Sequence, residues 1–303
     1  MKYVITGGAG FIGSNLVNRL IEDKHELHVI DNFCTGKKEN CNSAAEYHNY
    51  DVSNVENFNQ IKTIMKDTDC VFHTAALARV QPSIKNPIEY EINNTIGIVH
   101  LLKTASDAGV RRFVYSSSSS AYGDPQKLPS QELHLSNPIS PYAAQKYYGE
   151  ICCKMFSKVY GIETISLRYF NVYGENQNLG GPYATVVGIF LKQVLDNEPM
   201  TINGDGENRR DYTYVGDVVN ANILALKSNK VGKGEVINIG SGKNLSVNEV
   251  ASMIGSRKVY QESVNEPAIT LADISKAKKL LNWEPKVILK DWIIEYKNKI
   301  GLN

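Results

Sequence analysis

The 303-residue chain lacks a strong excess of charge of either sign. Its 33 lysines and arginines oppose 32 aspartates and glutamates, which gives a formal net charge of +1. Nucleic acids and anionic membranes attract proteins through an extended basic field, and this composition provides none. We therefore expect neither nucleic acid nor a membrane as partner, and any anionic ligand must be held by local groups.

Long apolar runs and paired cysteines are also missing. No run reaches the roughly 18 residues that span a bilayer, and Met1 leads directly into the strand-like Tyr3–Ile5 without the features of a secretory leader. The five cysteines form no C-x-x-C pair and lie in no His-rich cluster. These absences predict a cytoplasmic protein with reduced cysteines and no metal.

Short apolar segments rich in β-branched residues recur, with helical stretches between them. They are Tyr3–Thr6, Leu27–Asp31, Cys70–Thr74, Phe113–Ser117, Ile165–Tyr169 and Val236–Ile239. Alternating strands and helices predict right-handed crossovers and a parallel sheet. Because the strands are continuously apolar, both faces of the sheet should be covered. The predicted class is α/β, with a doubly wound parallel sheet.

The alternation weakens after Tyr173, where glycine, asparagine and proline accumulate. We expect a second, smaller lobe here that binds substrate, built from residues 174–210 and 241–303. The larger domain would comprise residues 1–173 with returning segments near 211–240. The two would interleave along the chain.

A glycine-rich turn follows the first strand and opens an amphipathic helix. Gly7, Gly10 and Gly13 allow a tight turn and a close approach to a pyrophosphate, and the helix N-terminus offers free N–H groups. Such a pattern alone is weak evidence, but the strand, turn and helix come in the required order. We predict a Rossmann-type dinucleotide site here, including Phe11 and Ile12.

Asp31 ends the second strand, about 20 residues after the glycines, where a carboxylate can bind the adenosine ribose. It would repel a 2′-phosphate and so favours NAD over NADP, although Lys37 and Lys38 lie nearby. Asp51 could meet the adenine edge or could be an ordinary turn residue. The predicted contacts to the adenosine half are Asp31, Asn32, Asp51 and Val52.

Tyr142 and Lys146 lie near the start of a helix that Ser140 and Pro141 signal. Spacing of four places both on one helix face. Free tyrosine titrates near pH ~10, and a neighbouring ammonium and the helix N-terminus should lower its pKa toward neutrality. A chance Tyr-x-x-x-Lys pair is common, but serines at a strand end and the glycine turn favour catalysis.

Together these segments resemble the extended short-chain dehydrogenase/reductases, and within them the sugar-nucleotide epimerases and dehydratases, most nearly the UDP-glucose and UDP-N-acetylglucosamine 4-epimerases. The likeness covers nearly the whole chain. Its motifs are Thr6–Gly13, His73–Ala76, Asn94 with Gly97, Ser116–Gly123, Tyr142–Lys146, Arg168–Gly174, Asn203–Gly206, Arg210–Tyr212 and Ala272–Ala277.

The resemblance implies roles for individual residues. Ser118 would hydrogen-bond the reacting hydroxyl, Tyr142 would act as acid and base, and Lys146 would bind the nicotinamide ribose. Asn171 and Arg210 would contact the substrate diphosphate, for which a guanidinium is suited; a salt bridge from Arg210 to Asp211 or another carboxylate is the alternative. Further implied contacts are Ala75, Ala76 and Asn94 to the cofactor and Ser119, Ser120 and Thr270 to the substrate.

Ser119 and Ser120 argue against one of the family's reactions, the 4,6-dehydration of a sugar nucleotide. The family's 4,6-dehydratases carry an Asp-Glu pair where this chain has Ser119 and Ser120, and a hydroxyl cannot replace a carboxylic acid there. The implied activity is 4-epimerisation of UDP-GlcNAc/GalNAc, with or without UDP-Glc/Gal, through a 4-keto sugar. A 4-dehydrogenase or reductase acting on a GDP-, CDP- or dTDP-sugar, and a non-catalytic NAD or sugar-nucleotide sensor, remain as alternatives.

The chain differs from its relatives at two positions that bear on the substrate. UDP-sugar relatives carry a second arginine shortly before the segment matching Ala272, which this chain lacks, so Lys258 could substitute. Thr270 stands where relatives restricted to plain hexoses have tyrosine, so an N-acetyl group should fit; Ile269 or Leu271 would take this place if the register slips.

The helix after Tyr142 has more apolar residues than one core-facing side needs, which predicts a homodimer. These residues are Tyr148, Cys152, Met155 and Phe156.

Overall fold

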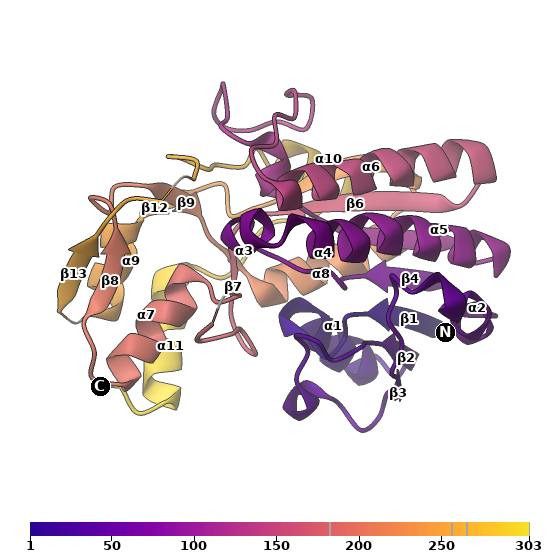
Figure 1. Ribbon diagram of the computed structural model, residues 1–303, viewed down its shortest axis with the longest axis horizontal. Helices are drawn as coiled ribbons and strands as arrows, with labels where there is room; N and C mark the ends of the chain where they lie inside the picture. Colours follow the sequence, from indigo (N-terminus) through magenta and orange to yellow (C-terminus); the bar gives the residue numbers. More distant parts are fainter. Residues whose placement is uncertain (182, 256, 265, 303) are drawn as a thin grey trace.

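The computed structural model describes residues 1–181, 183–255, 257–264 and 266–302. Its centre is a seven-stranded sheet in the order β11-β6-β5-β4-β1-β2-β3 (Figure 1). Every pairing in it is parallel. The strands are β1 (Lys2–Thr6), β2 (Glu26–Ile30), β3 (Glu46–His48), β4 (Cys70–His73), β5 (Arg112–Ser118), β6 (Glu163–Tyr169) and β11 (Lys233–Ile239). All six predicted strands are present, and the doubly wound α/β prediction is confirmed.

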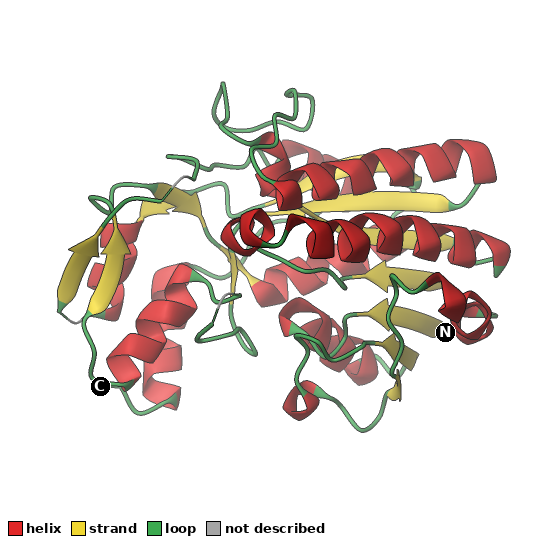
Figure 2. Cartoon of the chain, viewed as in Figure 1, coloured by secondary structure: helices red, strands yellow, loops and turns green. Residues whose placement is uncertain are grey.

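Helices cover both faces of this sheet (Figure 2). One layer holds α1 (Phe11–Glu22), α8 (Val215–Lys227) and α10 (Ser275–Leu281), and the other holds α2 (Phe58–Met65), α5 (Gly97–Asp107) and α6 (Pro141–Tyr160). Successive side chains along a strand point to opposite faces of the sheet, so each strand packs against both layers of helices. In β1, Tyr3 and Ile5 are buried against the first layer and Val4 against the second.

Short helices lie in the connections between the strands and the longer helices. After β4 the chain forms α3 (Val80–Lys85), α4 (Pro87–Glu91) and a π-helical turn, η3 (Ile92–Ile96), which runs directly into α5. Three single-turn 3-10 helices complete this part: η1 (Lys38–Asn40), η2 (Val55–Asn57) and η4 (Ser119–Tyr122). Within the described residues, none of the helices has both the length and the apolar character needed to cross a bilayer.

A smaller lobe with its own core lies beside the sheet, at the left of Figure 1. It contains α7 (Val186–Leu195), α9 (Val247–Ile254), α11 (Leu289–Lys299) and the pair β8 (Met200–Asn203) and β13 (Lys258–Gln261). Two further pairs are β7 (Val172–Tyr173) with β10 (Thr213–Tyr214), and β9 (Arg209–Asp211) with β12 (Asn244–Ser246). Because α10 and Trp283 belong to the larger core, we propose the interleaved division with residues 275–283 moved to the larger domain.

Candidate active site

A cavity of about 520 Å³ lies at the carboxyl ends of β1, β2, β4 and β5. Both parts of the molecule line it: Gly7 and Tyr142 come from the sheet side, and Arg210 and Thr270 come from later segments. Ligands of open α/β sheets bind at this edge. The volume is in the range of small-molecule sites.

The glycine turn forms one wall of the cavity. Gly7 has a φ of +71°, and a Cβ there would lie 2.7 Å from the backbone of Ala75. A Cβ on Gly13 would lie 2.1 Å from the carbonyl oxygen of Gly7, so only glycine permits this approach. Gly10 caps α1, whose first turn contains no acidic residue. Gly7, Gly10, Phe11, Ile12 and Gly13 all line the cavity. Gly7 N and Gly10 N donate within the protein, to Ile30 O and Gly7 O, so the amides of Phe11, Ile12 and Gly13 at the start of α1 are the ones that suit a pyrophosphate.

Asp31 is held beside this turn. Its Oδ2 accepts a hydrogen bond from Ala9 N at 2.9 Å and its Oδ1 accepts one from Phe33 N at 2.8 Å. The adjoining Asn32 donates to Asp51 Oδ2 at 3.0 Å, and both line the cavity with Val52. The two backbone hydrogen bonds thus hold the Asp31 carboxylate in the wall of the cavity.

The two nearby lysines take no part in this wall. Lys37 and Lys38 are absent from the cavity lining, and Lys37 Nζ lies 3.8 Å from Glu39 Oε1. The residues present therefore fit NAD, with no cation placed for a 2′-phosphate.

Asn94 does not reach the cavity. Its Oδ1 accepts from Leu77 N at 2.9 Å, and its Nδ2 donates to Leu77 O and to Gln145 Oε1. With its amide thus occupied, it braces the loop after β4 against α6. The expectation of a direct cofactor contact is corrected to a positioning role, whereas Ala75 and Ala76 of that loop do line the cavity.

Ser118 and Tyr142 both line the cavity, and their side chains share a hydrogen bond. Ser118 ends β5 and caps η4, accepting from Ser120 N at 3.1 Å. Tyr142 lies in the first turn of α6, which Ser140 caps and Pro141 begins. One turn on, the buried Lys146 donates to Ser116 O at 2.7 Å, and its Nζ lies 5.9 Å from the centre of the Tyr142 ring.

The pKa of Tyr142 shifts in the direction opposite to the predicted one. Burial raises the pKa of Tyr142, while a hydrogen bond with Ser118 and the positive charge of Arg79 act in the opposite direction. Burial also lowers the pKa of Lys146 to about 7. A lowered tyrosine pKa was wrong for this environment, because desolvation of the phenolate outweighs the favourable charges.

Ser119 and Ser120 line the same cavity. No carboxylate therefore occupies the two positions directly after Ser118. The geometry supports proton transfer at one hydroxyl, by Ser118 and Tyr142, and gives no acid for an elimination at these positions.

On the substrate side, Asn171 donates from Nδ2 to Thr270 Oγ1 at 3.2 Å, and both line the cavity. Ile269 and Leu271, the two alternatives for this position, do not line the cavity. Arg210 pairs with Glu266 at 3.1 Å.

The alternative for Arg210, a salt bridge to a carboxylate, is present, although Arg210 also lines the cavity. Its partner is Glu266 and not Asp211, whose carboxylate accepts from Ser241, Gly242 and Ala272. Lys258 does not replace the missing arginine: its Nζ donates to Ser252 Oγ at 2.8 Å, and it lies outside the cavity lining.

Arg79 is a cavity residue that sequence reasoning missed. Its Nε and Nη2 each donate to the carbonyl oxygen of Tyr183 at 3.1 Å. Its φ is 85°, which is uncommon for a residue with a side chain and typical of functional positions. The only signal in the sequence was its place three residues after the motif His73–Ala76.

The fold and the site define a Rossmann-type, NAD-binding enzyme whose cavity is lined by Ser118 and Tyr142, with Lys146 one helical turn from the tyrosine. The chain belongs to the NAD dependent epimerase/dehydratase family, whose model matches residues 3–240.

Curated and solved relatives agree with this assignment. A putative UDP-glucose 4-epimerase of Methanocaldococcus jannaschii is 40% identical over 298 residues, covering 96% of this chain and 95% of that protein. A UDP-glucose 4-epimerase of Thermotoga maritima, solved with UDP-glucose, superposes with a TM-score of 0.93 at 38% identity, covering 99% and 100%. A UDP-N-acetylglucosamine 4-epimerase of Methanobrevibacter ruminantium, solved with UDP-N-acetylmuramic acid, gives 0.91 at 34%, covering 100% and 99%.

Proposed function

We propose that this chain is an NAD-dependent 4-epimerase of a UDP-activated hexose, with UDP-GlcNAc and UDP-GalNAc as its substrate pair. One observation carries the proposal: Ser118 and Tyr142 share a cavity with the glycine turn, and serines occupy the two positions where a dehydratase needs carboxylates. The names of the three relatives support the sugar-nucleotide class.

The residues act on the sugar C4–OH. Ser118 hydrogen-bonds this hydroxyl, and Tyr142 removes its proton as the C–H bond at C4 breaks. Bound NAD supplies the hydride acceptor and later the donor. The 4-keto sugar then presents its other face, and Tyr142 returns the proton to O4. Lys146 and the amides of Phe11–Gly13 would hold the cofactor in place throughout.

Interconversion assays test the proposal. Purified protein is incubated with UDP-GlcNAc, UDP-GalNAc, UDP-Glc or UDP-Gal, and products are followed by NMR while absorbance reports reduced nicotinamide. An epimerase forms the C4 epimer without net NADH. Accumulating NADH with a ketone would indicate a dehydrogenase, and no change with any UDP-, GDP-, CDP- or dTDP-sugar would indicate a sensor.

Thr270→Tyr is expected to reduce kcat/KM for N-acetylated sugars more than for plain hexoses. A tyrosine forced into this wall would cost about 1 to 3 kcal/mol where an acetamido group competes for the space, or roughly 5- to 150-fold. Thr270→Ser is the matched control, because it keeps the hydroxyl that Asn171 contacts. Equal losses on both sugar types would show that Thr270 does not select the substrate.

We propose Arg79 as the second cation of the substrate site. It lines the cavity, and no carboxylate within the described residues pairs with it. Arg79→Met should raise KM for the nucleotide sugar about 10- to 150-fold, which corresponds to the roughly 1.5–3 kcal/mol of a hydrogen bond to a charged group. Bound NAD should remain. Arg111→Met, on a half-exposed arginine that pairs with Glu163, is the control, and an unchanged KM in Arg79→Met would exclude this role.

We also propose a homodimer. Tyr148 and Met155 on α6 are 40% and 41% exposed, while Cys152 and Phe156 are buried and face the core instead. Further exposed apolar residues on α6 and the adjoining α4 and η3 extend this surface: Ile88, Ile92, Ile96 and Ile151. Light scattering should give twice the 33.7 kDa chain mass; a monomer at micromolar concentration would contradict the dimer.

We propose a cytoplasmic location as well. All five cysteines are free, which supports this proposal.

A further inference from the structure

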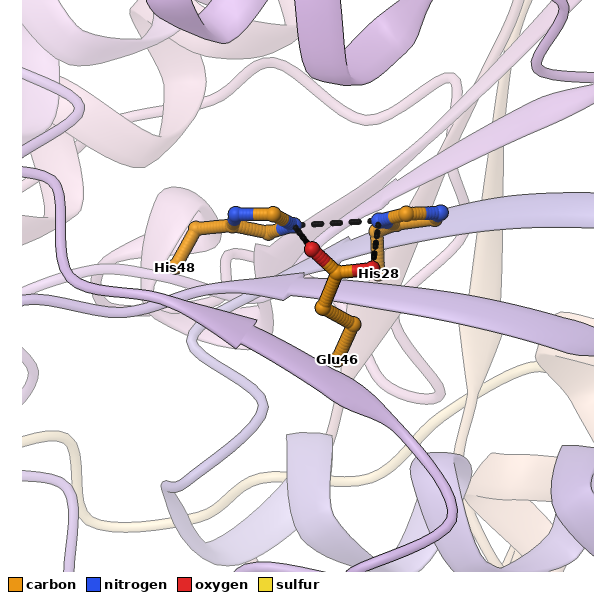
Figure 3. A group of neighbouring side chains, drawn as sticks. All are labelled: His28, Glu46 and His48. Carbon is orange, nitrogen blue, oxygen red and sulfur yellow. Dashed lines mark hydrogen bonds and ion pairs between the residues drawn. The ribbon is translucent and has the colours of Figure 1, made fainter.

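Two histidines and a glutamate gather at the edge of the main sheet, on β2 and β3 (Figure 3). These strands pair in parallel with His28 opposite Glu46 and Ile30 opposite His48. Because side chains alternate along a strand, Glu46 and His48 point to the same face. The strand register therefore brings together three side chains that are separated by up to twenty residues in the chain.

The donor atoms of these side chains converge. His28 Nδ1 lies 3.0 Å from His48 Nε2, and the carboxylate oxygens of Glu46 lie 3.6 Å from the first nitrogen and 3.5 Å from the second. Ligands about 2.0–2.2 Å from a tetrahedral zinc ion stand roughly 3.3–3.6 Å from one another. An ion can thus be enclosed with only small side-chain movements.

Glu26 supports the same arrangement. Its Oε1 lies 3.2 Å from His28 Nε2. A histidine that donates its Nε2–H to a carboxylate turns the lone pair of Nδ1 toward the other two ligands, as metal-binding histidines do. The Glu46 side chain is 65% exposed, which leaves an entry path and room for water as a fourth ligand.

We propose that His28, Glu46 and His48 bind one divalent first-row transition ion, a site separate from the catalytic cavity. Imidazole and carboxylate ligands suit Zn²⁺ or Co²⁺, whereas Mg²⁺ and Ca²⁺ prefer all-oxygen sets. The expectation of no metal rested on cysteine spacing and on the lack of a His-rich cluster. This site arises from pairing between strands.

The ion would brace the edge of the sheet next to the adenosine half of the NAD site. Asp31 N donates to the carbonyl oxygen of His48 at 3.1 Å, so the backbone of one ligand holds the predicted ribose-binding residue. An ion that binds the folded chain alone stabilises it.

Metal titration of the tag-free, NAD-loaded protein tests this site. Cys34→Ser and Cys41→Ser form the background, because both thiols are accessible and compete for zinc. We expect one Co²⁺ or Zn²⁺ per chain, a Co²⁺ spectrum without a thiolate band, and a higher unfolding temperature with Zn²⁺ than with Mg²⁺.

Variants separate this site from adventitious binding. His28→Ala and His48→Ala should each weaken binding at least about 10-fold, and the shape-preserving Glu46→Gln and Glu26→Gln about 10-fold. His134→Ala, on a histidine outside the sheet, should leave binding unchanged. Unaltered affinity in the His28→Ala, His48→Ala double variant, or no saturable binding at millimolar metal, would overturn the proposal.

Discussion

Tyr142→Phe is expected to lower turnover by about 10²- to 10⁴-fold, the usual contribution of a positioned acid or base. The substitution removes the phenolic hydroxyl at the start of α6, which lies in the cavity and hydrogen-bonds Ser118. The glycine turn and Asp31 are untouched, so NAD should remain bound. Loss of activity without loss of cofactor would place the defect in proton transfer.

Steady-state epimerisation and the NAD content of the purified protein measure these two effects. Tyr160→Phe is a matched control, because Tyr160 ends the same helix and stacks on Phe156 far from the cavity. The control should retain full turnover. Turnover of Tyr142→Phe within a few-fold of the parent would refute the proposed mechanism.

Glu150→Gln is expected to destabilise the fold by about 3 to 5 kcal/mol, because it leaves a buried guanidinium without its counter-charge. Glu150 and Arg168 are each about 97% buried and form a bidentate pair, with distances of 2.7 Å and 2.6 Å. Glu150 also accepts a hydrogen bond from Ser117, the residue before Ser118. The pair thus joins α6 to β6, and the hydrogen bond from Ser117 connects it to the end of β5 next to Ser118.

Denaturant unfolding of the parent and of Glu150→Gln measures this loss. Asp107→Asn is the control, since Asp107 forms an exposed pair with Lys103 on α5 and such pairs contribute about 0 to 1 kcal/mol. A loss in Glu150→Gln no larger than that of the control would show that the buried charge is compensated by other groups.

Local patterns predicted most of the larger domain. The strands, the glycine turn and the start of α6 at Ser140 depend on neighbouring residues: side-chain alternation, backbone freedom at Gly7, and a cap followed by Pro141. Such rules act over a few residues and are visible in the chain itself. The nicotinamide cofactor and the epimerase family followed from these motifs in order.

The predictions that failed concern which distant groups meet. Asn94 turns to Leu77, and Lys258 is held by Ser252. In both cases the polar group is occupied by a partner from another element of the fold. Electrostatics failed for the same reason, because burial of Tyr142 depends on everything packed around it.

Periodicity and short-range spacing along the chain were enough to predict the class of the fold, the dinucleotide turn and the shared helix face of Tyr142 and Lys146. The place of Arg79 in the cavity wall and the 3.0 Å distance between His28 Nδ1 and His48 Nε2 became evident only in the folded chain. Contacts of that kind are set by strand register and by crossover connections, which join segments with no regular separation along the chain.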